Sequence, residues 1–334
     1  MKYSMNDFIK TLPASKKALP ILSFPCISLL GISVKELISS PTLQANGMKA
    51  IAERTASAAA LSFMDLSVEA ECFGASVRFY DDEVPTITGR LINNEYEADA
   101  LKIPAVGSAR SGIYVEAIKE AKNIITDRPV IAGMIGPFSL AARLLDVTEI
   151  MVDCYDEPDM VHTVLKKSTE FLKNYAAALK AAGADGIMMA EPVSGLLSPT
   201  LEEEFSSPYV KEIIDFIQDD EFALIYHNCG DNTLTMTDSF ISMGAAAYHF
   251  GNSIDLSAMI EKFPEDTVIM GNIDPAGTLR MGTPKKVREE TLALLGRCSK
   301  YPNFVLSSGC DIPPMTPWEN IDAFFAASGE FYGK

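Results

Sequence analysis

The segment Ala223-Leu-Ile-Tyr-His-Asn-Cys-Gly-Asp231 sets the pattern from which the fold of this chain can be inferred. It is a short apolar run that ends in side chains able to bind a soft metal, followed at once by glycine and aspartate. A second segment of the same form, Val305-Leu-Ser-Ser-Gly-Cys-Asp-Ile-Pro313, lies near the end of the chain. We interpret both as buried β-strands that end in loops. On an extended chain, His227 and Cys229 are two residues apart, so their side chains point the same way.

Strand and helix patterns alternate on both sides of this segment. In the second half of the chain, strands are predicted to begin near residues 185, 222, 247, 267 and 304, with a helical pattern after each. Three longer units precede them, which makes about eight units with no linker-like stretch between them. This count predicts an α/β fold, a single (β/α)8 TIM barrel in one domain over residues 1–334. An open, doubly wound sheet is the alternative, but no Gly-x-Gly-x-x-Gly motif follows an early strand.

The first part of the chain is predicted to add an N-terminal helical extension and a β-excursion to this barrel. Residues 21–28 are expected to form a first buried strand that ends in a loop, and residues 65–74 are expected at the end of the second strand. Alternation over residues 75–92 predicts a surface hairpin. Helices are predicted over residues 34–38, 42–60, 202–218 and 232–243, among others.

Composition excludes several classes of function. The 334 residues carry a net charge of −17, which argues against nucleic acid or an anionic membrane as a partner, since binding phosphates requires clustered Lys and Arg. No apolar run approaches the roughly 18 residues of a membrane span, and residues 1–7 are polar, without the apolar core of a signal peptide. The six cysteines show no paired spacing. We therefore expect reduced thiols and a cytoplasmic location.

Soft-metal ligands follow two of the predicted strands. Because the carboxyl ends of parallel strands share one edge of a barrel, His227, Cys229 and Cys310 are expected to converge there. One imidazole and two thiolates are three of the four ligands of a zinc site, and a catalytic zinc keeps one position for substrate. Glu191, at the end of the preceding strand, is the best-placed carboxylate for the fourth position and for a catalytic role. The alternatives are buried structural thiols, and a role for Glu191 at the barrel rim.

Other strand ends also carry polar groups. His249 is interpreted as a buried core histidine, with a supporting role beside the metal ligands as the alternative. Asn252 and Asp274 could each be turn or capping residues. A zinc held by two thiolates is suited to one task in particular: it binds a substrate thiol, lowers its pKa and holds it as a nucleophilic thiolate.

These residues, in this order, resemble the uroporphyrinogen decarboxylase superfamily, and most closely its zinc-dependent, corrinoid-linked methyltransferase branch, the methylcobalamin:coenzyme M methyltransferases and their relatives. The similarity covers nearly the whole chain. It is carried by the segments Asp65 to Gly74, Gly136-Pro-Phe138, Ala190-Glu-Pro192, His227-Asn-Cys-Gly230, Gly271-Asn-Ile-Asp-Pro275 and Ser308-Gly-Cys-Asp311.

The resemblance implies a (β/α)8 barrel with His227, Cys229 and Cys310 as zinc ligands. It further implies that the protein transfers a methyl group between a corrinoid and a thiol such as coenzyme M. The corrinoid is then methylcobalamin or is carried by a partner corrinoid protein, and the implied cofactors are zinc and the corrinoid. Asp65 and Glu191 are then the candidate catalytic carboxylates, and Asn272 and Asp274 are expected to bind the cofactor. Arg110, Arg143 and Arg280 are candidates for the sulfonate of coenzyme M, and the sequence does not choose among them.

Three other functions stay open on the sequence alone. One is the reverse transfer, in which a methylated small molecule is demethylated onto the corrinoid. Another is a metal-free decarboxylase that works through Asp65, but the segment Ile21-Leu-Ser-Phe-Pro-Cys-Ile-Ser28 lacks the arginines that the decarboxylases use to hold their substrate's carboxylates. The third is a non-catalytic corrinoid- or metal-binding module.

Overall fold

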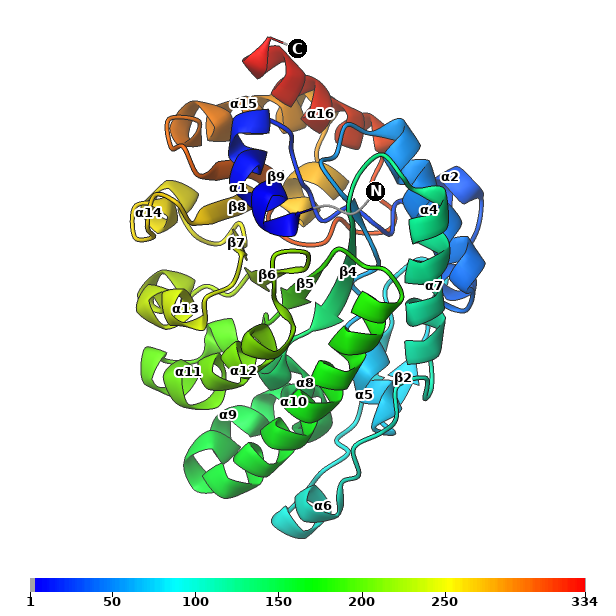
Figure 1. Ribbon diagram of the computed structural model, residues 1–334, viewed down its shortest axis with the longest axis vertical. Helices are drawn as coiled ribbons and strands as arrows, with labels where there is room; N and C mark the ends of the chain where they lie inside the picture. Colours follow the sequence, from blue (N-terminus) through cyan, green and yellow to red (C-terminus); the bar gives the residue numbers. More distant parts are fainter. Residues whose placement is uncertain (1–3, 334) are drawn as a thin grey trace.

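The computed structural model describes residues 4–333, so residues 1–3 of the polar N-terminal segment, and Lys334, lie outside it. Its centre is a curled parallel sheet in the strand order β1-β4-β5-β6-β7-β8-β9 (Figure 1). The ladders are parallel throughout, as the α/β barrel prediction requires. The strands are β1 (Ala60–Leu61), β4 (Val130–Ile135), β5 (Gly186–Ala190), β6 (Ala223–Asn228), β7 (Ala247–Phe250), β8 (Val268–Ile273) and β9 (Phe304–Ser308).

An extended segment closes the barrel between its last and first strands. The Leu19 N–H donates to the Leu306 carbonyl of β9 at 2.9 Å, and the Ala58 N–H, just before β1, donates to the Ala18 carbonyl at 2.9 Å. This segment occupies the place of an eighth strand, although it makes too few backbone hydrogen bonds to form a ladder. The predicted strand over residues 21–28 is therefore wrong in its bounds, because the chain turns at Phe24-Pro25 and forms helix α2 (Cys26–Leu30).

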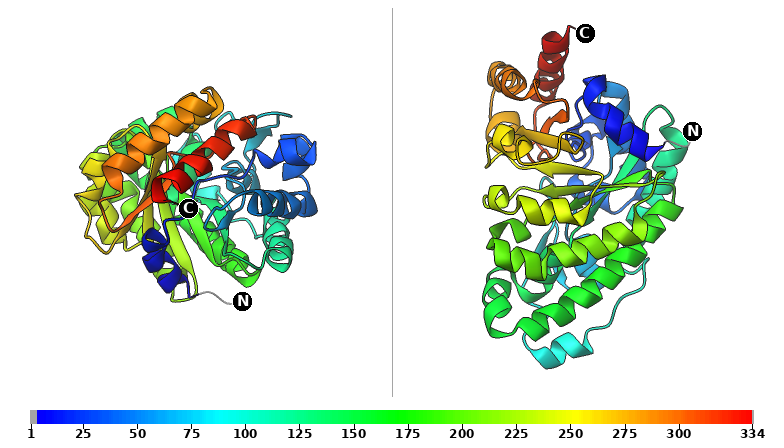
Figure 2. Two further views of the ribbon diagram at one scale, coloured as in Figure 1. Left: turned by 90° about the horizontal axis from the view of Figure 1, so that it is seen from above. Right: turned by 60° about the vertical axis from the view of Figure 1, so that its left-hand side comes forward.

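Helices surround the sheet and cover its outer face (Figures 1 and 2). They are α3 (Val34–Ile38), α4 (Pro41–Arg54), α5 (Val68–Cys72), α6 (Glu95–Ala100), α7 (Ser111–Ile124), α8 (Pro137–Leu145), α9 (Val147–Asp156), α10 (Pro158–Ala181), α11 (Pro199–Phe205), α12 (Ser207–Ile217), α13 (Thr237–Met243), α14 (Leu256–Ile260), α15 (Pro284–Cys298) and α16 (Trp318–Tyr332), with short helical turns η1 (Ser194–Leu196), η2 (Thr233–Thr235) and η3 (Pro275–Arg280).

Three predicted helix boundaries are wrong for local reasons. The helix expected to reach Ala60 ends at Arg54, because the small apolar residues that follow lead into β1. The helix over 202–218 breaks into α11 and α12 at Ser206, where Pro208 starts the second helix. The helix over 232–243 begins as the turn η2. Residues 68–72, expected near a strand end, form α5.

One end of the barrel is closed by the N-terminal helix α1 (Met5–Ser15). Met5, Ile9 and Leu12 are buried with side chains of the barrel interior, among them Met188 and Ile225. The Asn6 N–H donates to the carbonyl of Asp220, which precedes β6, so α1 lies at the amino ends of the strands. The carboxyl ends of the strands therefore remain accessible. Enzymes with a (β/α)8 barrel bind their substrates at this end.

The predicted β-excursion is confirmed as a hairpin of β2 (Ser76–Arg78) and β3 (Thr86–Thr88), which are antiparallel. Its connecting residues contribute to the wall of the cavity at the carboxyl ends of the strands. Among residues 4–333, no helix is long and apolar enough to span a membrane.

Candidate metal centre

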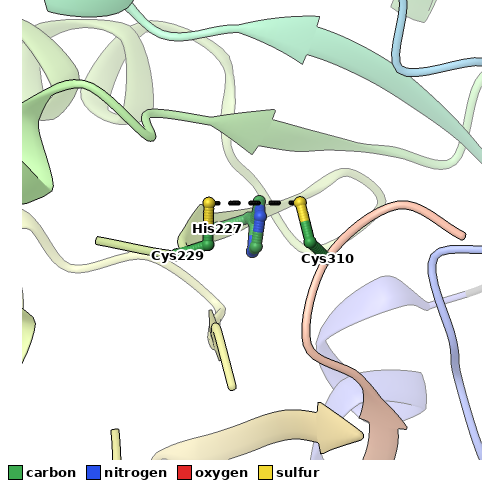
Figure 3. Close-up of side chains that lie close together, drawn as sticks. All are labelled: His227, Cys229 and Cys310. Atoms are coloured by element: carbon green, nitrogen blue, oxygen red, sulfur yellow. Dashed lines mark hydrogen bonds between the residues drawn. The ribbon is translucent and has the colours of Figure 1, made fainter. Parts of the chain in front are cut away.

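The three predicted soft-metal ligands lie together at the carboxyl ends of β6 and β9. Ligand atoms of His227, Cys229 and Cys310, one from each residue, lie within 4.8 Å of one another, and the two sulfur atoms are 4.0 Å apart. Figure 3 shows the imidazole of His227 between the two thiols. We call these three residues the His–Cys cluster. Space for it depends on Gly251, since a Cβ there would lie 2.6 Å from the Cα of Cys229.

The imidazole of His227 presents one free nitrogen. Its Nδ1 lies 2.8 Å from Nδ1 of His249, the residue paired with it on the neighbouring strand β7. Its Nε2 is buried and has no hydrogen-bond partner within the described part of the chain. A buried polar atom without a partner is costly in a folded protein. A bound metal would satisfy it, so two thiols and this nitrogen fit the ligand set of zinc.

The two thiols do not titrate alike. The Cys310 thiol donates to the sulfur of Cys229, and this bond lowers the pKa of Cys229. The same bond, together with burial, raises the pKa of Cys310. Cys229 is therefore the thiol that ionises first, and a bound metal would displace the remaining proton.

A cavity of about 420 Å³ lies beside the His–Cys cluster. Its remaining lining is largely apolar and includes a single guanidinium, that of Arg280 at the end of η3. Arg280 has no hydrogen bond or ion pair with any residue of the described range 4–333. The other lining residues are Met64, Leu66, Glu83, Val84, Thr86, Ala190, Pro192, Asp311, Pro313 and Pro314.

Glu191 is not brought into the His–Cys cluster. Its carboxylate accepts hydrogen bonds from the N–H groups of Phe138 at 3.0 Å and Ser139 at 2.5 Å, in the first turn of α8. A helix N-terminus stabilises a negative charge in this position. Burial nevertheless raises the pKa of Glu191 from 4.5 to about 7. In this geometry Glu191 caps a helix, and its assignment as a metal ligand rests on the sequence pattern alone.

Asp65 lies in a separate, fully bonded group at the end of β1. One carboxylate oxygen pairs with the guanidinium of Arg110 and accepts from the Tyr114 hydroxyl at 2.8 Å. The other accepts from the N–H and hydroxyl of Ser67, at 3.1 and 2.6 Å. We call Asp65, Ser67, Arg110 and Tyr114 the Asp65 cluster. Both carboxylate oxygens therefore already have partners, and Asp65 is not among the residues that line the cavity.

The two predicted cofactor-binding residues, Asn272 and Asp274, form hydrogen bonds with the backbone around them. The Asn272 amide donates to the carbonyls of Gly251 and Ile254, at 2.9 and 3.1 Å. Asp274 accepts from the N–H groups of Ala276 and Gly277, at 2.9 Å each, which caps η3. Both residues line another cavity of about 600 Å³, outside the His–Cys site. Asp274 is linked to the site only indirectly, because it caps η3, which carries Arg280.

Part of this site was not predicted from the sequence. The hairpin residues Glu83, Val84 and Thr86 line the cavity, and no sequence signal placed that hairpin over the barrel mouth. Arg143 and Arg110, weighed beside Arg280 as anion-binding residues, are absent from the cavity lining. His249, for which the sequence left a core role and a supporting role open, is buried and contacts His227, a predicted metal ligand.

Comparisons with known proteins agree with this arrangement. Residues 20–331 match the family model described as uroporphyrinogen decarboxylase (URO-D). The chain is 28% identical to the methylcobamide:CoM methyltransferase MtbA of Methanosarcina acetivorans, over 77% of this chain and 75% of that protein. It is 30% identical to the methylcobamide:CoM methyltransferase MtaA of Methanosarcina barkeri, over 80% of this chain and 78% of that protein.

The decarboxylases themselves are also relatives. The uroporphyrinogen decarboxylase of Prochlorococcus marinus is 26% identical, over 71% of this chain and 68% of that protein. Among solved structures, a methyltransferase from Methanosarcina mazei superposes with a TM-score of 0.85 at 26% identity, covering 97% of this chain and 98% of that one. The chain belongs to the uroporphyrinogen decarboxylase (URO-D) family.

Proposed function

We propose that this protein is a zinc-dependent methyltransferase that moves a methyl group between a corrinoid and a small thiol. The observation that carries the proposal is the His–Cys cluster, in which three soft ligands converge beside an apolar cavity. The relatives named as methylcobamide:CoM methyltransferases support the same assignment. We also propose that the whole chain forms one domain, since the family match leaves only short ends uncovered.

His227, Cys229 and Cys310 would hold the zinc, and the substrate would reach the metal from the cavity. Zinc bound there would lower the pKa of the substrate thiol and hold it as a thiolate. The thiolate sulfur would attack the methyl carbon of the methylcorrinoid. An S–CH₃ bond would form as the Co–C bond broke, and both electrons of the broken bond would remain with cobalt as Co(I). The apolar wall, with Met64, Leu66 and Val84, would keep water from the nucleophile.

The unpaired guanidinium in the cavity favours a thiol with an anionic end. Arg280 is the arginine in the lining, and it has no carboxylate partner in the described chain. A sulfonate or carboxylate on the substrate would complete its hydrogen bonds. A cavity of about 420 Å³ accommodates a small molecule of this kind, such as coenzyme M.

Apolar side chains around the mouth of the cavity suit a corrinoid partner. Met281 is 76% exposed and Met315 is 51% exposed. In the sequence, each is the residue after one that lines the cavity. Met side chains adapt well to a flat hydrophobic face. A corrinoid protein is therefore the proposed methyl-carrying partner, with its macrocycle presented to this rim.

The reverse transfer, from a methylated small molecule to the corrinoid, would use the same groups. The decarboxylase alternative is less supported, because Asp65 is already paired with Arg110 and the cavity contains one arginine for a substrate with many carboxylates. A binding module without catalysis would hold zinc and leave methylcobalamin unchanged.

The direct test is a methyl-transfer assay on the purified chain with a measured zinc content. Methylcobalamin is mixed with a panel of thiols that includes coenzyme M, and loss of its absorbance is followed. We expect about one zinc per chain and methyl transfer that stops when a chelator removes the metal and resumes when zinc is restored. Full zinc loading without transfer to any thiol, with free methylcobalamin or a methylated corrinoid protein as donor, would overturn the proposal. Coproporphyrinogen formation by zinc-free protein would establish the decarboxylase instead.

A further inference from the structure

A buried chain of hydrogen bonds runs from the His–Cys cluster across the barrel to the segment that closes it. It consists of His227 on β6, His249 on β7, Ser307 on β9 and the carbonyl of Leu19. The four residues are each at most 1% exposed. They come from four separate parts of the sequence, and a role of the last three in metal binding does not follow from the proposed function.

The direction of each hydrogen bond in this chain follows from counting protons. The Ser307 hydroxyl donates to the Leu19 carbonyl at 2.7 Å, because a carbonyl can only accept. That hydroxyl has one hydrogen, so towards His249 Nε2, at 2.7 Å, it can only accept. His249 therefore carries its hydrogen on Nε2.

The state of His227 follows in the same way. Its Nδ1 lies 2.8 Å from Nδ1 of His249 and 3.3 Å from the carbonyl of His249. Since the carbonyl must accept, the hydrogen is on Nδ1 of His227, and Nδ1 of His249 accepts with its lone pair. In a neutral His227 the remaining lone pair is then on Nε2, the nitrogen without a partner in the described chain.

We infer that His249 and Ser307 are positioning residues that hold His227 in the one tautomer able to bind a metal through Nε2. Metal-binding histidines commonly donate their second nitrogen to a carboxylate, a carbonyl or water. Here the acceptor is a second imidazole, whose own tautomer is set by a serine and the backbone. This arrangement transfers no charge to the ligand. It ties the tautomer of the metal ligand to the closure of the barrel, because Leu19 also bonds to Leu306 in β9.

The inference rests on the proposed zinc site, yet the tautomer can be measured without zinc. The chain has three histidines, so ¹⁵N-labelled, metal-free protein gives three imidazole patterns in a long-range ¹H–¹⁵N spectrum. His162, whose Nδ1 contacts the Tyr209 hydroxyl at 2.7 Å, serves as an internal reference. We expect the hydrogen on Nδ1 in His227 and on Nε2 in His249. A hydrogen on Nε2 of His227 in the wild-type, metal-free protein would overturn the inference.

Variants of the serine separate tautomer control from simple destabilisation. Ser307→Ala removes the acceptor for His249 Nε2, so we expect mixed tautomers in both His249 and His227 and zinc binding that is roughly 10-fold weaker. Ser307→Thr keeps the hydroxyl and should restore both values. Ser308→Ala is the matched control, because Ser308 is equally buried on the same strand but accepts from the Ile21 N–H instead. Equal effects of Ser307→Ala and Ser308→Ala on the spectrum would contradict the inference.

A variant of the second histidine gives an independent readout. His249→Phe removes the acceptor for His227 Nδ1, and we expect zinc affinity to fall by roughly 10- to 100-fold in a chelator competition. His249→Asn returns an amide oxygen near the position of Nδ1 and should recover part of the loss. If the tautomers are as expected but no methyl transfer occurs, the proposed function fails and the positioning role stands. Methyl transfer by a wild-type protein whose metal-free form shows mixed His227 tautomers would support the proposed function and reject the positioning role.

Discussion

The His–Cys cluster and the Asp65 cluster lie at the carboxyl ends of different strands of one barrel, and they use their polar atoms in opposite ways. In the Asp65 cluster both carboxylate oxygens are saturated by an arginine, a tyrosine and a serine. In the His–Cys cluster the Nε2 of His227 has no partner in the described chain, and the Cys310 thiol donates to the sulfur of Cys229.

We interpret this difference as the one between a structural site and the proposed metal site. A saturated ion pair inside a protein fixes the backbone around it and has nothing left for a ligand. An open set of ligand atoms carries the cost of unpaired polar groups until something binds. Both clusters contain residue types typical of active sites, so residue type alone does not distinguish them, whereas the satisfaction of each atom does.

Removing the Cys310 thiol should have the largest of the expected effects, a loss of zinc affinity. We expect Cys310→Ala to reduce zinc affinity by well over 100-fold, since even residues behind the ligands contribute roughly 10- to 100-fold. Methyl transfer should be lost with the metal. Zinc stoichiometry after dialysis is the measurement. Cys298→Ala is the control, because Cys298 is buried in α15, away from the site, and should keep its zinc. A Cys310→Ala protein that retained stoichiometric zinc would remove the basis of the site.

Breaking the Asp65 cluster should reduce stability and leave the metal in place. Asp65→Leu leaves the buried Arg110 with Glu71 as its remaining carboxylate partner, and we expect a loss of about 3 kcal/mol in the free energy of unfolding. Urea denaturation measures it, and zinc content should stay at the wild-type level. The double variant Asp65→Leu/Arg110→Met should recover much of the stability. Loss of zinc in a folded Asp65→Leu protein would show that the two clusters are not independent.

Glu191 should behave as a buried carboxyl rather than as a ligand. Its folded-state pKa of about 7 exceeds the usual 4.5, so between these values the folded chain binds a proton that the unfolded chain releases. Stability contributed by this proton is present at low pH and is lost as the pH rises to about 7. Glu191→Gln removes this titration. Between pH 5 and 7.5 the free energy of unfolding of the variant should therefore fall by about 2 kcal/mol less than that of the wild type. Urea midpoints at pH 5 and 7.5, with the exposed Glu116→Gln as control, provide the comparison. A variant as pH-dependent as the wild type would disprove this assignment.

The smallest expected effect concerns the unpaired arginine. Arg280→Ala should raise the KM for an anionic thiol by about 10-fold, the value of one exposed charge-assisted hydrogen bond, and leave kcat nearly unchanged. A neutral thiol of the same length is the matched control and should show no change in KM. Arg280→Lys should be intermediate, because it keeps the charge and loses the planar donors. Equal changes for both thiols would mean that Arg280 acts on the shape of the cavity.

The sequence was sufficient to predict the barrel and the His–Cys cluster, because both depend on patterns within single strands. His227 lies in β6, Cys229 directly follows that strand and Cys310 follows β9, so their meeting requires only parallel strands. The resemblance to the URO-D family was likewise visible in short motifs and is confirmed by the match over residues 20–331.

Contacts between distant segments could not be predicted in the same way. Whether Glu191 faces a metal or the first turn of α8 depends on where α8 packs. The pairing of Asp65 with Arg110 spans 45 residues, and the closure of the barrel by residues near Leu19 rests on isolated backbone bonds that leave no periodic signal. Ser307 carries no sequence mark at all, since its role depends on the side chains that lie across the barrel.

X-ray absorption at the zinc edge, recorded before and after addition of the thiol substrate, tests the central claim most directly. We predict a resting site with one nitrogen and two sulfur ligands from the protein and one light atom from solvent. Addition of the thiol should then introduce a third sulfur at about 2.3 Å. A zinc already closed by four protein ligands, with a spectrum that the thiol does not change, would contradict a site built to activate a thiol.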